Sequence, residues 1–291
     1  MVNIYNCCYK TIKKQYNALL KHEEGVLVDR DIEEIHQMRV AVRRIRAALI
    51  AFEPCLNQSY VSLFIDDLKQ LASKLGAVRD LDVSIVSFNA YIEQFPENDG
   101  IKYLINHYQA KRKSNLKKLF KFLKSKKYTK LKKKLLIFID HLKDESNKPD
   151  TEKQYNAFYK SFEELIDEVF SFKKIDNIKD SEKDLHNLRI AIKHLRYNLE
   201  FISLQEKEAK KILRKLKYYQ EKLGVINDCN IMNKRINKLL KKQTLDSNIL
   251  NLISNFIAFN RELKTNEKSK IDLPWNTLSD KEIKKLYIPE T

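Results

Sequence analysis

Histidine, arginine and lysine recur at helical spacing in two segments of the sequence, and their side chains can bind anions. The first set is His36, Arg39, Arg43 and Arg46. On an α-helix these intervals place all four side chains within an arc of about 80°. Arginine stays charged and can hold two phosphate oxygens in its planar fork. The set, which we name the first ridge, therefore indicates a binding surface for a phosphate-rich anion.

The same spacing returns 150 residues later in His186, Arg189, Lys193 and Arg196, the second ridge. Lys193 keeps the positive charge but lacks the arginine fork. Like charges at these intervals destabilise an isolated helix by a few tenths of a kcal/mol per pair, so two such rows indicate a binding role. An apolar arc beside each ridge predicts that the ridges border the core: Ile35, Met38, Val42, Ile45 and Leu49 in the first copy, and Leu185, Leu188, Ile192, Leu195 and Leu199 in the second.

A second matched segment follows each ridge. LGAVRD at 75–80 aligns with LGVIND at 223–228, and each contains one of the four glycines of the chain. Because glycine weakens a helix, we expect a turn between two helices here. In both copies a lysine precedes the glycine by seven residues: Lys69 and Lys217.

The elements that must position these residues are helices. Four glycines and five prolines in 291 residues are too few for the turns of a β-sandwich or barrel, so the sequence predicts an all-α protein. Periodicity predicts four helices in each half: 3–22, 31–53, 57–75 and 79–95, then 152–173, 181–203, 206–223 and 228–242. Lysine-rich helices are expected over 99–145, and a closing helix over 247–266. The polar stretch 144–151 around Pro149 divides the chain into repeats at 1–145 and 146–291.

Charge and composition restrict the partners and the compartment. The net charge is +17, and thirteen lysines and arginines without an acid lie at 111–134, a run typical of a solvated helix face. Cys7, Cys8, Cys55 and Cys229 lack CxxC spacing and are expected to be reduced. Neither a signal peptide nor an 18-residue apolar stretch is found, so we expect a cytoplasmic protein without a membrane span.

Catalytic motifs are missing from the sequence. It contains no HExxH, no glycine-rich phosphate loop and no GxSxG, and no carboxylate stands at metal-ligand spacing beside either histidine. We therefore expect a binding protein without catalytic activity, cofactor or metal.

The doubled motif, HQMRVAVRRIRAAL and HNLRIAIKHLRYNLEF, each followed by its LG segment, resembles the CHAD domain, a helical domain named for conserved histidines. The resemblance covers about residues 3–266. It implies two antiparallel four-helix bundles related by pseudo-twofold symmetry, with a basic groove or pore between them. It also implies binding of inorganic polyphosphate and recruitment to polyphosphate granules. The implied contacts are both ridges with Lys69 and Lys217, while Asn227, at the place of Arg79, leaves the role of that position open.

Three alternatives remain open at this stage. The histidines could bond across helices while the arginines extend to solvent along their methylenes. The lysine run and fourteen tyrosines would suit an RNA- or DNA-binding helical module, although Tyr197 is the one aromatic that directly follows a ridge residue. An enzyme acting on polyphosphate is least favoured, because no metal-binding carboxylate cluster accompanies the ridges.

Overall fold

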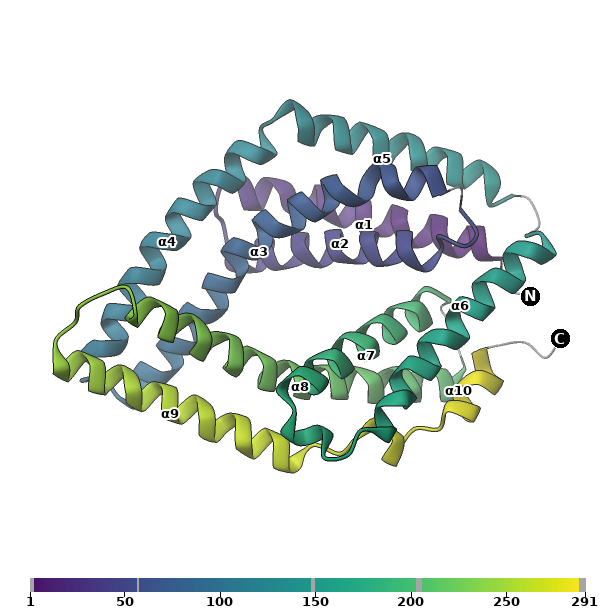
Figure 1. Ribbon diagram of the computed structural model, residues 1–291. Coiled ribbons are helices and arrows are strands. Elements are labelled where there is room, and N and C mark those ends of the chain that lie inside the picture. Colours follow the sequence, from purple (N-terminus) through teal and green to yellow (C-terminus); the bar gives the residue numbers. More distant parts are fainter. Residues whose placement is uncertain (1–2, 57, 148–149, 203–205, 288–291) are drawn as a thin grey trace.

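The computed structural model describes residues 3–56, 58–147, 150–202 and 206–287. These residues form ten α-helices, three short 3-10 turns and no strand, which confirms the all-α class (Figure 1). The first half contains α1 (Ile4–Leu27), α2 (Ile32–Ala51), α3 (Gln58–Gln94), α4 (Asp99–Leu123) and α5 (Lys126–Glu145). The second contains α6 (Glu152–Ser171), α7 (Glu182–Ile202), α8 (Lys207–Leu240), α9 (Ser247–Lys270) and α10 (Asp280–Tyr287). Pro149, at the expected boundary, and position 203, at the expected end of a helix, lie outside the described residues.

The two ridge helices begin at the polar residues that precede them in the sequence. The Asp31 side chain accepts a hydrogen bond from the backbone N–H of Glu33 at 3.0 Å and caps α2. The Ser181 hydroxyl accepts one from the backbone N–H of Asp184 at 3.2 Å at the start of α7. Each cap satisfies a backbone donor that has no partner inside the helix, so the two ridges start at equivalent turns.

The expected turn at the LG segments is wrong: α3 and α8 run through Gly76 and Gly224 without interruption. An interior glycine costs a helix about 1 kcal/mol, and burial of apolar neighbours readily offsets that amount. Leu75 and Val78 flank the first glycine, and both are fully buried. A Cβ atom at Gly76 would lie 2.6 Å from Nη1 of Arg39, so this glycine admits the arginine rather than ending the helix.

Two hydrophobic clusters hold the helices together. The larger draws on α1, α2, α5, α6, α7 and α10, on the amino-terminal parts of α3 and α8, and on the carboxyl-terminal part of α4. The smaller joins the carboxyl-terminal parts of α3 and α8 to α4 and α9. The long helices α3 and α8 therefore pass through both clusters. All ten residues of the two expected apolar arcs are buried, which confirms that both ridges border the core.

The carboxyl-terminal segment packs back against the second half of the chain. The hydroxyls of Tyr219 and Thr277 lie 2.5 Å apart, and Pro274 is buried. On α10, Lys284 pairs with Glu163 of α6 at 2.9 Å. Figure 1 shows α10 beside α6 and far from α4.

The lysine-rich pair α4 and α5 is only partly a solvated face. Most of its lysines are exposed, but Arg112 is 17% exposed and has specific partners. Its Nε donates to Asp82 at 2.5 Å, and its terminal nitrogens donate to Asp29 at 2.8 and 2.9 Å. Lys132 likewise pairs with Glu23 at 2.8 Å. These contacts tie the hairpin to α1 and α3, so part of the charge run is structural.

The two LG glycines should respond differently to alanine. Nothing within 4 Å would meet a Cβ at Gly224, so Gly224→Ala should raise the free energy of unfolding by about 0.5–1 kcal/mol. Gly76→Ala should gain less, because the Arg39 guanidinium must move away. Urea unfolding of both variants measures the difference, and equal gains would contradict a close Arg39 contact in solution.

Candidate functional site

The two ridges are brought together where α2 contacts α7. The pKa of Lys193 on α7 reflects how close the two ridges lie. Its pKa is lowered to about 8 by desolvation and then by the positive charges of Arg189, Arg43, Arg46 and Arg39. Three of these arginines belong to the other ridge, so cations from both repeats act on one ammonium group.

A small cavity of about 190 Å³ lies at this contact. Arg43 and Arg46 line it from α2, Lys193 and Tyr197 from α7, and Ser161 from α6. A single cavity therefore receives charged side chains from both ridges. His36 and His186 do not line it; they stand near the amino-terminal ends of the ridge helices.

The aromatic ring of Tyr197 contacts three arginine side chains. The guanidinium carbons of Arg43, Arg44 and Arg196 lie 5.8, 5.5 and 4.8 Å from its ring centroid. Such contacts attract a cation to the ring face by about 0.5–2 kcal/mol. Because Tyr197 is 1% exposed, its ring orients arginines and offers no surface for stacking a base.

Glu200 neutralises positive charge at the carboxyl-terminal end of the second ridge. It pairs with Arg196 on its own helix and with Arg44 of α2 at 2.8 Å. The Nε of Arg196 also donates to Gln220 on α8 at 3.1 Å. One carboxylate thus joins α2 to α7, and Arg44, which does not lie on the ridge, contributes to the same contact.

Asp80 neutralises positive charge near the amino-terminal end of the first ridge. Its carboxylate lies 3.9 Å from Arg39 and 2.7 Å from Arg235 on α8. The same carboxylate raises the pKa of Asp228, which desolvation raises most strongly. Because Asp80 and Asp228 end the two LG segments, these segments of α3 and α8 lie near each other.

Four ridge cations form no ion pair with the described residues, although Asp228 acts electrostatically on one of them, Arg189. Within the described part of the chain, no ion pair forms at Arg43, Arg46, Arg189 or Lys193. For the three arginines, the buried Nε has no hydrogen-bond acceptor among the described residues. Buried donors are normally satisfied, so this group has unused capacity for an anion.

The ridge histidines have different partners in the two repeats. His36 has its pKa lowered by desolvation and by Arg79, and it is therefore largely neutral at pH 7. His186 holds Nδ1 2.8 Å from Oδ1 of Asn227, the residue that replaces Arg79. The amide at 227 thus accepts a hydrogen bond from a histidine where the first repeat places a charge.

Lys69 and Lys217 are exposed and pair with acids on their own helices. Lys69 lies 3.4 Å from Asp66, and Lys217 lies 3.7 Å from Glu221. No hydrogen bond or ion pair joins either lysine to a ridge within the described residues. Seven residues make about two turns, or about 10 Å, of helix. Lys69 therefore lies on the same face of α3 as Gly76, which faces Arg39. Their role in binding stays a prediction.

Sequence reasoning missed the partners that come from distant helices. Arg235 belongs to neither matched motif. Glu200 lies within HNLRIAIKHLRYNLEF, but no periodic pattern marks it as the partner of two arginines. Asp80 lies in a matched motif, but the sequence alone does not show that it holds two arginines. A search for acids able to balance each ridge would have identified Asp80.

The arrangement presents buried guanidinium donors that can hold an anion. No group of three histidine, cysteine or carboxylate side chains suited to a metal occurs in the described part of the chain. In the same ranges, none of the helices has the length and apolar character needed to cross a membrane.

Comparison with known proteins identifies the family of this chain. The family model described as CHAD domain matches residues 10–237. The chain belongs to the CHAD domain family. CHAD domains are generally non-catalytic binding domains, and the family is linked to polyphosphate. The match ends before the last residues of α8, so α9 and α10 lie outside it.

Solved structures share the CHAD fold. The CHAD domain from the plant Ricinus communis superposes with a TM-score of 0.68 at 22% identity, over 99% of this chain and 92% of that one. PptA from Streptomyces chartreusis gives a TM-score of 0.73 at 12% identity, over 94% and 99%. Two uncharacterized Mycobacterium tuberculosis proteins, MT2285 and Rv2226, are 32% identical over 75 residues, which span 26% of this chain and 14% of each relative.

The charge on Lys193 should affect stability in a defined pH window. Its folded pKa of about 8 lies below the value of about 10.4 for a free lysine. Between these values the unfolded chain binds more protons, so stability should rise with pH, whereas below pH 8 the full penalty is present. Lys193→Met should therefore be more stable than wild type at pH 7, with a difference that shrinks by pH 10.

Urea unfolding at pH 7, 8.5 and 10 measures this difference. Lys193→Arg is the matched control, because it stays charged and should not approach the stability of Lys193→Met as the pH rises. A Met variant whose advantage is constant with pH would show that Lys193 titrates normally.

Proposed function

We propose that this CHAD domain binds inorganic polyphosphate through a basic cleft lined by both ridges. The observation that carries the proposal is the group of four unpaired cations, two on α2 and two on α7: Arg43, Arg46, Arg189 and Lys193. A linear chain of phosphates would supply acceptors for these donors and remove the repulsion among them. The contacts expected are those of both ridges, with Lys69 and Lys217 at the flanks.

We propose further that the repeats, 1–145 and 146–291, form two four-helix bundles related by pseudo-twofold symmetry around this groove. Support comes from the matched order of elements, since α2 and α3 correspond to α7 and α8. Both pairs place a ridge on the first helix and an LG segment on the second.

Polyphosphate fits the site better than a nucleic acid. Sequence-tolerant readers of single strands add exposed aromatic rings on which bases stack. Tyr197 is buried beneath arginines. The shared cavity of about 190 Å³ is lined by three cations, Arg43, Arg46 and Lys193, together with aliphatic and polar side chains, His194 and Tyr197 itself. In the cell we expect a cytoplasmic protein recruited to polyphosphate granules, without catalysis of its own.

Removing two unpaired ridge cations should abolish most of the binding. Arg43→Gln with Arg189→Gln breaks no ion pair, so the fold should persist. Each charge-assisted contact contributes about 1.5–3 kcal/mol, which predicts a loss of about two orders of magnitude or more in affinity for polyphosphate. Isothermal titration calorimetry at several salt concentrations measures it.

The matched control is Lys118→Gln with Lys130→Gln, which removes the same charge from exposed lysines of α4 and α5. This variant should lose affinity by less than about threefold and mainly reduce the salt dependence. RNA of equal phosphate content serves as competitor. If the control loses binding while the ridge variant keeps it, a diffuse surface more suited to nucleic acid replaces the proposed cleft.

Binding should also be accompanied by proton uptake. A phosphate beside Lys193 favours its charged form and returns its pKa toward the normal value. At about pH 8.5, polyphosphate binding should therefore take up a proton, seen as a dependence of calorimetric enthalpy on the ionisation enthalpy of the buffer. Lys193→Arg should bind and take up none. Equal uptake by both proteins would place the phosphates away from Lys193.

A further inference from the structure

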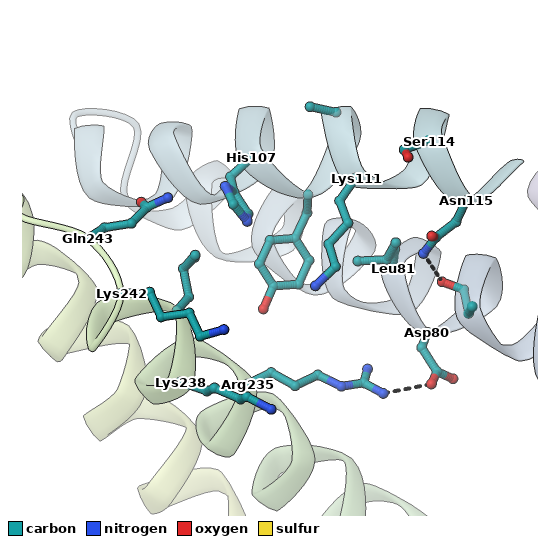
Figure 2. Close-up of a pocket in the computed structure, with 14 residues that line it drawn as sticks. Asp80, Leu81, His107, Lys111, Ser114, Asn115, Arg235, Lys238, Lys242 and Gln243 are labelled. Atoms are coloured by element: carbon teal, nitrogen blue, oxygen red, sulfur yellow. Dashed lines mark hydrogen bonds and ion pairs between the residues drawn. The ribbon is translucent and has the colours of Figure 1, made fainter. Parts of the chain in front are cut away.

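A further cavity among the described residues lies outside both ridges. It has a volume of about 890 Å³ and opens between α3, α4 and α8 (Figure 2). Leu81 and Asp80 line it from α3, His107 and Lys111 from α4, and Lys242 from just beyond α8. It adjoins the smaller hydrophobic cluster, to which Leu81 belongs.

The walls of this cavity are strongly basic. Four cationic side chains, which we name the cavity cations, line it: Lys111, Arg235, Lys238 and Lys242. Against them stands one acid, Asp80, whose charge is balanced by Arg235 at 2.7 Å. Figure 2 shows side chains from α4 and α8 directed into the same space.

Three of the cavity cations carry unbalanced charge. Lys111, Lys238 and Lys242 are exposed, and none forms an ion pair with the described residues. The pKa of His107 is lowered by desolvation and then by Lys111, which shows that this lysine acts on the cavity wall. Because the one acid in the wall, Asp80, is paired with Arg235, the remaining cations that face the cavity attract a multivalent anion.

The cavity is continuous with the first ridge through one carboxylate. Asp80 lies in the cavity wall and also 3.9 Å from Arg39. Arg39, Asp80 and Arg235 therefore form a short line of alternating charge from the ridge to the cavity. An anion that displaced Asp80 from Arg39 would already stand at the cavity entrance.

These cations are not part of the doubled motif. Lys238 and Lys242 lie beyond residue 237, where the match to the family model ends. Lys111 belongs to the lysine-rich segment at 111–134, outside the ridge and LG motifs of the first repeat. The cavity is thus a feature of this chain that the ridges do not account for.

We propose that this cavity is a second phosphate-binding site, which takes the continuation of a polyphosphate chain whose first part lies on the ridges. The inference rests on the proposed function. It makes the protein selective for long chains, because a short oligophosphate fills the ridge site and does not reach the cavity cations. A strand of RNA is disfavoured, because Tyr108 in the cavity wall is 4% exposed and offers no stacking face.

The test uses two ligands and two matched triple variants of the full chain. The cavity variant is Lys111→Gln, Lys238→Gln and Lys242→Gln. The control variant is Lys121→Gln, Lys130→Gln and Lys133→Gln, which lowers the net charge from +17 by the same three units at exposed positions of α4 and α5. The probes are sodium tripolyphosphate and long-chain polyphosphate, titrated by calorimetry at one salt concentration.

The cavity variant should lose affinity for the long chain by about tenfold or more and keep wild-type affinity for tripolyphosphate. The reason is that each exposed lysine contributes modestly to binding, whereas this variant removes three of them together. The control variant should change both affinities by less than about threefold. Circular dichroism should show unchanged helix content, since the substituted lysines are exposed.

The outcomes separate this inference from the proposed function. Equal affinity of the cavity and control variants for the long chain overturns the second site while leaving ridge binding intact. A wild-type protein that binds neither phosphate overturns both. Loss of tripolyphosphate binding in the cavity variant also overturns the inference, because the cavity would then be the primary site.

Discussion

Two helices that carry like charge, α2 and α7, contact each other at the centre of the candidate site. Two unit charges about 8 Å apart repel by about 2 kcal/mol at an effective dielectric constant of about 20. The ridges bring several like charges close enough to act on one another at the contact of α2 with α7. Burial of an aliphatic side chain contributes about 1.5–3 kcal/mol, and all ten residues of the two apolar arcs are buried. The core therefore supplies the free energy that holds the cations in place.

The distribution of acids follows from that constraint. Glu200 and Asp80 relieve the repulsion at the two ends of the ridges and leave the middle unbalanced. Lys193, which lies between these two acids, instead has a lowered pKa. An anion that enters meets donors already oriented, because Tyr197 underlies three of the arginines. Such preorganisation reduces the ordering cost of binding.

The sequence predicted features that repeat at the period of a helix. Spacing alone identified both ridges and the arcs beside them, because these positions depend only on the rotation per residue. It failed at Gly76, where a glycine looked like the end of a helix. The reason for that glycine is a side chain 37 positions earlier, Arg39, and no local pattern contains that information. Arg235 was missed for the same reason, since its partner Asp80 lies in the other half of the chain.

The uninterrupted course of α3 and α8 has a functional consequence. A turn at each LG segment would have allowed the two hydrophobic clusters to move independently. As single helices, α3 and α8 enter both clusters and fix the position of Asp80 relative to the core beneath the ridges. The line from Arg39 through Asp80 to Arg235 is thus held by helices anchored at both ends. In the proposed binding mode, a phosphate chain would extend from the ridges into the cavity between α3, α4 and α8. Because α3 and α8 are anchored in both clusters, this extension would require side chains to move while the helices keep their positions.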